Sequence, residues 1–366
     1  MPTHPPRICA VITSKTCREA RASLDLAAQK ADIAELRLDY LTDFDFSNPE
    51  SLAPILEGKR LPVIITCRIP DEGGFQIIDD SIRLPLLIEG AKRFADYCDI
   101  EASRYQQAAN QDPDESKLIL SWHNFTETPA DIEQKYTEIV KLPAAVHKLA
   151  TRANDISDVL PIFRLLDRAQ SKNRNLIALA MGPRGLITRI LGPSRGAFLT
   201  YASIEAGAES APGQITLDDL NSVFRLRTLK DSTRIAGVIG APVGHSASPA
   251  MHNSAFASFG INAVYLPLEV RDLEAFFRRF VRAQTREFRW EPLGFSVTIP
   301  HKIAVVGLLD EIDETARAIG AVNTVVVREG RLLGYNTDAE GATLPLEAVT
   351  PLAGRHCALI GAGGSA

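Results

Sequence analysis

One lysine stands inside a short apolar run at residues 144–151 (AAVHKLAT). If this run is a β-strand, the alternation of side chains places Val146, Lys148 and Ala150 on one face and His147 on the other. A lysine among apolar neighbours is unfavourable, because a buried ammonium must lose its water or find a partner. Two interpretations remain open. Either Lys148 lies near an edge and its head reaches solvent, or it is an amine that attacks a carbonyl carbon and forms a Schiff base.

Polar residues also stand at the ends of other apolar runs in the first 226 residues. His123 is the candidate for proton transfer, because it is expected one strand away from Lys148 and at matching depth. A lone histidine is more often a hydrogen-bonded core residue, and the pair Arg37 and Asp39 is more typical of a structural ion pair. The further candidates at these ends are Glu35, Arg37, Arg68, Glu72, Arg189, Ser210 and Gln214.

The segments that must position these residues alternate between strand-like and helix-like patterns. Eight apolar runs begin at Arg7, Ala34, Leu61, Tyr97, Lys117, Ala144, Leu176 and Ala197. Helical patterns separate most of them, as at residues 156–169 and at residues 129–142, where Thr128 is the expected N-cap. Residues 41–60 are only weakly helical. Eight strands with helical crossovers predict an α/β fold of the (β/α)8 TIM-barrel type over residues 1–226, with the active site at the carboxyl ends of the strands.

Six motifs in this region, ELRLD, TCR…EGG, SWHNF, HKLAT, MGPRGLITR and SAPGQ, resemble the type I 3-dehydroquinate dehydratase family in their order and spacing. The resemblance implies dehydration of 3-dehydroquinate to 3-dehydroshikimate, without a cofactor. It implies that Lys148 forms an imine with the substrate ketone. His123 would remove the C2 proton and later protonate the leaving hydroxyl, and Glu72 would orient His123.

The same resemblance implies the residues that bind the substrate. Arg189, Ser210 and Gln214 would hold the substrate carboxylate, for which a bidentate arginine is suited. Glu35 and Arg68 would hold ring hydroxyls, and Arg37 is predicted to be a substrate-binding residue as well. Asn124 follows the histidine where many members of the family carry Asp.

The polar residues 227–234 read as a linker, and a second α/β unit is expected over residues 235–350. Ser246 and Ser248 lie in a Gly/Pro-rich loop, where they either contact a polar substrate or cap the helix that begins near Pro249. Lys302 and Asp338 follow apolar strands, a position that is also typical of surface residues. The stretch GAGGSA contains Gly361, Gly363 and Gly364 in the G-x-G-x-x-G/A pattern of dinucleotide-binding turns, which is weak by itself.

The motifs GAPVGHSASPAMHN, GFSVTIPHK, IGAVNTVV and GYNTDAEG resemble the shikimate dehydrogenase family. The resemblance implies that Ser246, Ser248, Thr298 and Asn323 contact shikimate. Lys302 and Asp338 would be the proton-transfer pair that accompanies hydride exchange with NADP. Residues 351–366 would be the first strand and turn of a Rossmann domain, so we expect a dehydrogenase half that is truncated and incomplete.

The order dehydratase then dehydrogenase is that of a fused bifunctional enzyme of the shikimate pathway, which leads to the aromatic amino acids. One alternative is a non-enzymatic regulator that senses a pathway metabolite with the same domains, although a sensor does not need an imine-forming amine. A second is a Schiff-base aldolase, which does not need the SAPGQ and SWHNF loops.

Composition limits the remaining classes. The chain has 366 residues, of which 45% are hydrophobic and 23% charged, and a formal net charge of −5. That balance offers no basic footprint for nucleic acid or a membrane surface. The five scattered cysteines form no CxxC pair, which argues against a zinc site or disulfides and favours a reducing compartment. No apolar run approaches the roughly 18 residues of a membrane span. We expect a cytoplasmic protein with small-molecule substrates, and a homodimer is left open.

Overall fold

The computed structural model describes residues 5–356 and 358. The chain divides into two compact units, one of residues 1–154 and 158–231 and one of residues 155–157 and 232–366, and each is described by itself. No helix among the described residues is long and apolar enough to cross a membrane.

The first unit is built on parallel strands that pair in the order β7-β6-β5-β4-β3-β2-β1-β8-β9. They are β1 (Ile8–Ile12), β2 (Ile33–Arg37), β3 (Val63–Thr66), β4 (Tyr97–Glu101), β5 (Leu118–His123), β6 (Val146–Arg152), β7 (Leu176–Met181), β8 (Thr200–Ser203) and β9 (Ile215–Thr216). A bridge between Leu176 and Ala197 joins β7 to the segment that leads into β8. All eight predicted strands are present, and the TIM-barrel prediction is confirmed.

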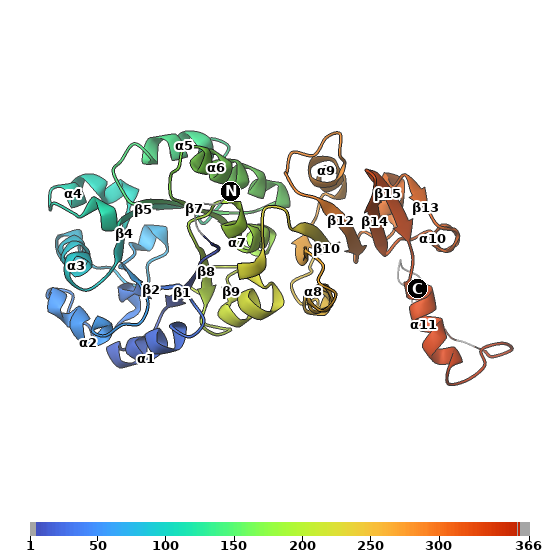
Figure 1. Cartoon of the computed structure of the whole chain (residues 1–366), viewed down its shortest axis with the longest axis horizontal. Coiled ribbons are helices and arrows are strands. Elements are labelled where there is room, and N and C mark those ends of the chain that lie inside the picture. Colours follow the sequence, from blue (N-terminus) through green and yellow to red (C-terminus); the bar gives the residue numbers. More distant parts are fainter. Residues whose placement is uncertain (1–4, 357, 359–366) are drawn as a thin grey trace. The chain divides into compact units, whose positions relative to one another are not determined.

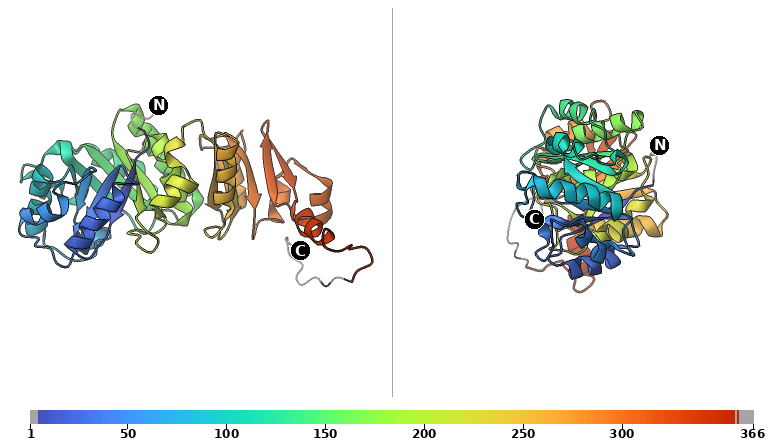
Figure 2. Two further views of the ribbon diagram at one scale, coloured as in Figure 1. Left: turned by 60° about the horizontal axis from the view of Figure 1, so that its bottom comes forward. Right: turned by 90° about the vertical axis from the view of Figure 1, so that its left-hand side faces the viewer.

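Helices cover the outside of these strands (Figure 1 and Figure 2). They are α1 (Cys17–Ala27), α2 (Ala53–Leu56), α3 (Asp80–Arg93), α4 (Tyr105–Ala109), α5 (Ile132–Ile139), α6 (Val159–Ser171) and α7 (Leu186–Leu191). The weakly helical residues 41–60 hold only a 3-10 turn (Pro49–Leu52) and the short α2. The expected cap at Thr128 is wrong, because α5 begins three residues after Pro129 and the Thr128 hydroxyl bonds to Thr151 and to the carbonyl of Arg152 instead.

Alternation along β6 decides which side chains enter the barrel. Val146 and Ala150 pack in the interior cluster with Ile119 and Ile177 from the neighbouring strands. His147 lies on the other face, where its Nε2 is 3.0 Å from the carbonyl oxygen of Leu142. The strand assignment of residues 144–151 is therefore confirmed, and Lys148 points to the interior.

The second unit holds a mixed sheet in the order β11-β10-β12-β14-β15-β13. Its strands are β10 (Arg234–Gly240), β11 (Ala263–Glu269), β12 (Pro292–Val297), β13 (Glu311–Ile312), β14 (Thr324–Arg328) and β15 (Arg331–Tyr335). Its α-helices are α8 (Ser248–Ser258), α9 (Leu273–Phe276), α10 (Glu314–Ile319) and α11 (Asp338–Glu347), and Ala304–Leu308 form a 3-10 helix. The hairpin β14–β15 was not expected from the sequence. Glu329 and Gly330 form its turn with positive φ angles of 52° and 78°, a backbone conformation suited to a two-residue hairpin loop.

Candidate active site

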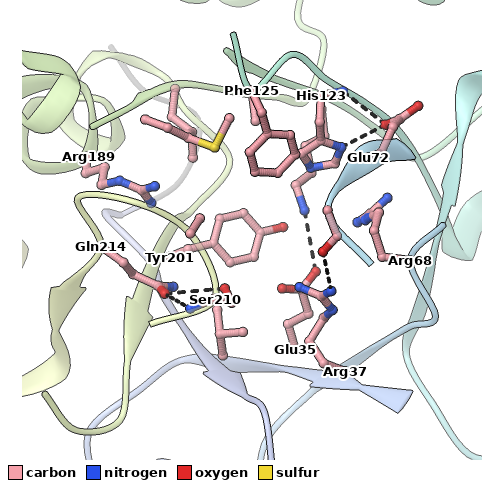
Figure 3. Close-up of a pocket in the computed structure, with 17 residues that line it drawn as sticks. Glu35, Arg37, Arg68, Glu72, His123, Phe125, Arg189, Tyr201, Ser210 and Gln214 are labelled. Atoms are coloured by element: carbon pink, nitrogen blue, oxygen red, sulfur yellow. Dashed lines mark hydrogen bonds and ion pairs between the residues drawn. The ribbon is translucent and has the colours of Figure 1, made fainter. Parts of the chain in front are cut away.

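A cavity opens at the carboxyl ends of the barrel strands and encloses about 470 Å³ including its mouth (Figure 3). All nine dehydratase candidates predicted from the sequence line it: Glu35, Arg37, Arg68, Glu72, His123, Lys148, Arg189, Ser210 and Gln214. They come from strands, and from the loops and helices that follow strands, far apart in the sequence, so the barrel brings the predicted set together.

Lys148 lies at the bottom of this cavity on β6. It is 5% exposed, so the interpretation as an edge lysine that reaches solvent is wrong. Its Nζ is 3.0 Å from Oδ2 of Asp99 and 3.4 Å from Oε1 of Glu35. The same nitrogen lies 4.4 Å from the centre of the Tyr201 ring. Two carboxylates and an aromatic face therefore hold the Lys148 side chain in place, and attack on a carbonyl requires the unprotonated amine.

Asp99 is shared between Lys148 and Arg68. Arg68 contacts both carboxylate oxygens of Asp99, at 2.9 and 2.8 Å, and also lies 2.5 Å from the hydroxyl of Ser121. Burial by itself would raise the pKa of Asp99, but the charges of Arg68 and Lys148 outweigh burial and hold it well below the usual range. Asp99 therefore stays ionised and fixes the position of the lysine.

A second buried arginine, Arg83, holds Arg68 in place through Glu101. Arg83 on α3 donates to Oε2 of Glu101 at 2.8 Å and to the carbonyl oxygen of Cys67 at 2.7 Å. The other oxygen of Glu101 accepts from Arg68 at 3.3 Å and from the backbone N–H of Ile69 at 3.1 Å. Arg83 thereby anchors the end of β3 from which Arg68 projects.

His123 pairs with Glu72. Oε2 of Glu72 is 2.9 Å from Nδ1 of His123 and also accepts the His123 backbone N–H at 3.0 Å. Burial raises the pKa of Glu72 to about 7, against a partial opposing effect of Arg68. Burial, with the positive charges of Arg68 and Lys148, holds the pKa of His123 well below its usual range. His123 is therefore a neutral imidazole near pH 7, and its Nε2 is available as a proton acceptor when ionised Glu72 accepts the hydrogen bond from Nδ1–H.

Arg189 forms a different kind of site at the other side of the cavity. It is 2% exposed, and its Nε has no hydrogen-bond partner among the described residues. Burial lowers its pKa to about 10. Ser210 and Gln214 stand nearby in the cavity lining and bond to each other, with the Ser210 N–H 2.8 Å from Oε1 of Gln214. A buried guanidinium without a carboxylate calls for an anionic ligand.

Arg37 is both an ion-pair residue and a lining residue. It makes two bonds to Asp39, at 2.9 and 2.7 Å, so the structural ion pair is present. Asp39 also accepts the backbone N–H of Phe75 at 2.9 Å, which ties down the loop that carries Glu72. Gly74 in this loop approaches the carbonyl of Arg68 so closely that a Cβ there would lie 2.0 Å from the oxygen.

Two residues that contact Lys148, Asp99 beneath the cavity lining and Tyr201 in it, were absent from the candidates. Asp99 stands two positions before Glu101 in a strand, so its spacing offered a signal for a pair of carboxylates on one face. Tyr201 on β8 offered none, because an aromatic residue in a strand is most often part of the core.

In the second unit, one pocket is lined by all six residues predicted for the dehydrogenase half, Ser246, Ser248, Thr298, Lys302, Asn323 and Asp338. Nζ of Lys302 is 2.5 Å from Oδ2 of Asp338, and Nδ2 of Asn323 is 2.7 Å from Oδ1. These bonds outweigh burial and lower the pKa of Asp338. Their pairing argues against independent surface roles for Lys302 and Asp338.

The loop before α8 settles part of the question about the two serines. Ala247 is the cap residue of α8, while the hydroxyl of Ser246 accepts the N–H of Ser248 at 3.2 Å. Both serines also line the pocket, so a role in ordering the loop and a role in the pocket are compatible. Gly361, Gly363 and Gly364 lie outside the described residues.

Comparison with known proteins now identifies the family. The family model described as type I 3-dehydroquinase matches residues 8–231. The chain belongs to this family. Within the second unit, the model of the shikimate dehydrogenase substrate binding domain matches residues 238–325. The predicted resemblances are thus confirmed for both parts.

Relatives of the type I 3-dehydroquinase family share this arrangement of two parts. The chain is 36% identical to the chloroplastic bifunctional 3-dehydroquinate dehydratase/shikimate dehydrogenase of Arabidopsis thaliana, over 99% of this chain and 62% of that protein. The solved dehydroquinate dehydratase and shikimate dehydrogenase of S. pombe AroM is similar with a TM-score of 0.51 at 25% identity, over 96% of this chain and 69% of that one.

A shikimate dehydrogenase (NADP(+)) of Shouchella clausii is 47% identical over 37% of this chain and 48% of its own length. The chain thus spans less than two thirds of the plant relative. These relatives carry enzyme names and give no support to a metabolite-sensing regulator.

Proposed function

We propose that the barrel dehydrates 3-dehydroquinate to 3-dehydroshikimate through a Schiff base on Lys148. The single observation that carries the proposal is that one cavity is lined by a buried lysine, a neutral histidine and an arginine whose Nε has no hydrogen-bond partner among the described residues. The lysine suits a ketone, the histidine suits a proton on the neighbouring carbon, and the arginine suits a carboxylate.

In the first step the ammonium of Lys148 loses a proton, for which neutral His123 is the base in the same cavity. The free amine attacks the ketone carbon to give a carbinolamine. The carbinolamine hydroxyl then takes that proton back from His123 and leaves as water, which gives the iminium ion and returns His123 to its neutral form. Asp99 and Glu35, which hold Lys148 in the free protein, then face the iminium cation and stabilise it.

In the second step Nε2 of His123 removes a proton from C2, and the C–H electrons move into the enamine. The imidazolium that forms lies 2.9 Å from Glu72, whose charge stabilises it. His123 then gives its proton to the C1 hydroxyl, which leaves as water while the enamine electrons form the new double bond. Hydrolysis of the product imine returns Lys148.

The substrate contacts are proposed accordingly. Arg189, Ser210 and Gln214 hold the carboxylate, and Glu35, Arg37 and Arg68 line the side of the ring hydroxyls. The dehydratase requires no cofactor in this scheme.

For the second unit we propose the substrate-binding part of an NADP-dependent shikimate dehydrogenase. Ser246, Ser248, Thr298 and Asn323 would contact shikimate, with Lys302 and Asp338 as the proton-transfer pair. The name of the Shouchella clausii relative supports NADP as the coenzyme, and Gly361, Gly363 and Gly364 would bind it. The division into a barrel (1–226), linker (227–234), substrate-binding domain (235–350) and Rossmann start (351–366) is part of this proposal. So is a cytoplasmic location, which the free thiols of Cys9, Cys17, Cys67 and Cys98 support.

Borohydride reduction in the presence of 3-dehydroquinate tests the mechanism. We expect a stable adduct on the Lys148 peptide by mass spectrometry, none in Lys148→Met, and an unchanged adduct in the control Lys302→Met. Formation of 3-dehydroshikimate without any lysine adduct would refute the Schiff base and leave the reaction standing. Absence of product from the wild-type chain would refute the function itself.

A further inference from the structure

The ring of Tyr201 packs against the Lys148 amine, but its hydroxyl has no assigned task. Tyr201 projects from β8 into the candidate active site and is 5% exposed. Its hydroxyl has no hydrogen-bond partner among the described residues. A buried hydroxyl without a partner is unfavourable, because it has lost its water and gained no hydrogen bond in return. A group of this kind that lines a cavity is suited to a ligand.

The direction of the hydroxyl narrows the ligand group. In the view of Figure 3 the ring of Tyr201 lies between Arg189 and the side with Glu35 and Arg68, and its hydroxyl points away from Arg189. Burial raises the pKa of Tyr201 well above its usual range, and the charge of Glu35 raises it further. The group is therefore a neutral O–H, a donor and acceptor, on the side opposite the proposed carboxylate site.

Glu35 offers a matching hydrogen-bond acceptor. Oε1 of Glu35 accepts from Thr66 at 2.9 Å and faces Lys148 at 3.4 Å. Oε2 takes part in no hydrogen bond within the described part of the chain. A ligand hydroxyl between the two residues can donate to Oε2 of Glu35 and accept from Tyr201, which satisfies both residues at once.

The position of Lys148 selects which hydroxyl this is. Both residues flank its Nζ, Glu35 at 3.4 Å and the ring centre of Tyr201 at 4.4 Å. Once Nζ is bonded to the substrate ketone carbon, the nearest ring hydroxyl is the one on the adjacent carbon, C4. We propose that Tyr201 is a substrate-contacting, specificity-determining residue that binds the C4 hydroxyl of the substrate together with Glu35. This inference rests on the proposed function and deepens it.

The test is a double-mutant cycle in which the Tyr201 hydroxyl and the C4 hydroxyl of the substrate are removed singly and together. The rate constant kcat/KM is measured for the wild-type chain and Tyr201→Phe, with 3-dehydroquinate and with its 4-deoxy analogue. The control is Tyr136→Phe, which also removes a buried hydroxyl without a partner, but from a residue of α5 that does not line the cavity.

We expect Tyr201→Phe to lower kcat/KM for 3-dehydroquinate roughly 3- to 10-fold, as for loss of one neutral hydrogen bond. With the 4-deoxy analogue, Tyr201→Phe and the wild type should react equally, because the bond is already absent. Tyr136→Phe should match the wild type on both substrates.

Equal activity of Tyr201→Phe and wild type on 3-dehydroquinate would overturn the inference while the function stands. The same fold-loss on both substrates would also overturn it, because the hydroxyl would then act on Lys148 rather than on C4. If the wild-type chain does not convert 3-dehydroquinate at all, the proposed function fails and the inference fails with it.

Discussion

Replacement of Glu72 by Gln separates two effects of one buried carboxylate. The amide oxygen of Gln can still accept both bonds that Glu72 accepts from His123, from Nδ1 at 2.9 Å and from the backbone at 3.0 Å. The tautomer and orientation of the ring are therefore kept, and what is lost is the negative charge beside the imidazolium that forms during proton abstraction. A charge-assisted bond exceeds a neutral one by about 1–2 kcal/mol, which is roughly a 5- to 30-fold loss in kcat/KM.

The size of this loss depends on pH. The pKa of Glu72 is raised to about 7, so its charge is present above pH 7 and is progressively absent below it. Glu72→Gln should therefore fall far behind the wild type at high pH, and the two should converge as the pH falls toward 6. Titration of His123 does not contribute to this pH dependence, because burial holds the pKa of His123 well below its usual range.

The same charge destabilises the folded chain. The unfolded state ionises Glu72 at its ordinary pKa, whereas the folded state keeps the proton until about pH 7. As the pH rises from the unfolded-state pKa to the folded-state pKa, the contribution of Glu72 to the free energy of unfolding decreases. Above the folded-state pKa it stays constant. A rise in pKa from 4.5 to about 7 corresponds to about 3 kcal/mol. We expect Glu72→Gln to raise the thermal midpoint above pH 7 while it lowers the rate.

The assays are kcat/KM from 3-dehydroshikimate formation between pH 6 and 9, and thermal unfolding at the same values. Asp71→Asn is the matched control, because Asp71 is the exposed neighbour of Glu72 on the same 3-10 turn and has no bond to His123. The reasoning is refuted if Glu72→Gln loses the same factor at every pH, or if it loses nothing at high pH.

Three further variants test other parts of the structure. Arg189→Met should raise KM for 3-dehydroquinate roughly 100-fold through loss of charge-assisted bonds to the substrate carboxylate. It should not lower the thermal midpoint, because no carboxylate in the described part of the chain pairs with this buried cation. Arg83→Met should lower the free energy of unfolding by about 3–5 kcal/mol in chemical denaturation, because Glu101 loses one partner of a buried ion pair. Asp338→Asn should weaken shikimate binding in calorimetry and leave the dehydratase rate unchanged, because Asp338 pairs with Lys302 in the other unit.

Each of these has an outcome that contradicts it. An unchanged KM in Arg189→Met would move the carboxylate site elsewhere. A loss below about 1 kcal/mol in Arg83→Met would mean that Glu101 is satisfied without it. A fall in dehydratase rate in Asp338→Asn would contradict the assignment of Asp338 to a separate reaction.

Local sequence patterns predicted the helices and strands of this protein well. They failed where a side chain bonds to a segment that is distant in the sequence. The eight barrel strands were predicted from apolar runs, because a buried strand needs only five or six consecutive residues that are mostly apolar. Thr128 was expected to cap a helix because the local signal is the same whether the hydroxyl meets its own helix or a neighbouring strand. In the structure it meets Thr151, which is 23 residues away.

The sequence by itself determined which chemistry is available and in which order the parts come. The types and spacing of Lys148, His123 and Glu72 within family motifs indicated imine formation and proton transfer, and alternation along one strand placed the lysine on the same face as Val146 and Ala150. Each motif is a short stretch of chain, and their order along the chain completes the resemblance.

Only the tertiary structure decided how the groups act on one another. Glu35 lies 113 residues from Lys148 in the chain and 3.4 Å from it in space. The neutral state of His123 and the free hydroxyl of Tyr201 depend on burial and on charges contributed by other strands. Coulomb and desolvation energies follow distance and solvent access in space, and neither quantity can be read along a sequence.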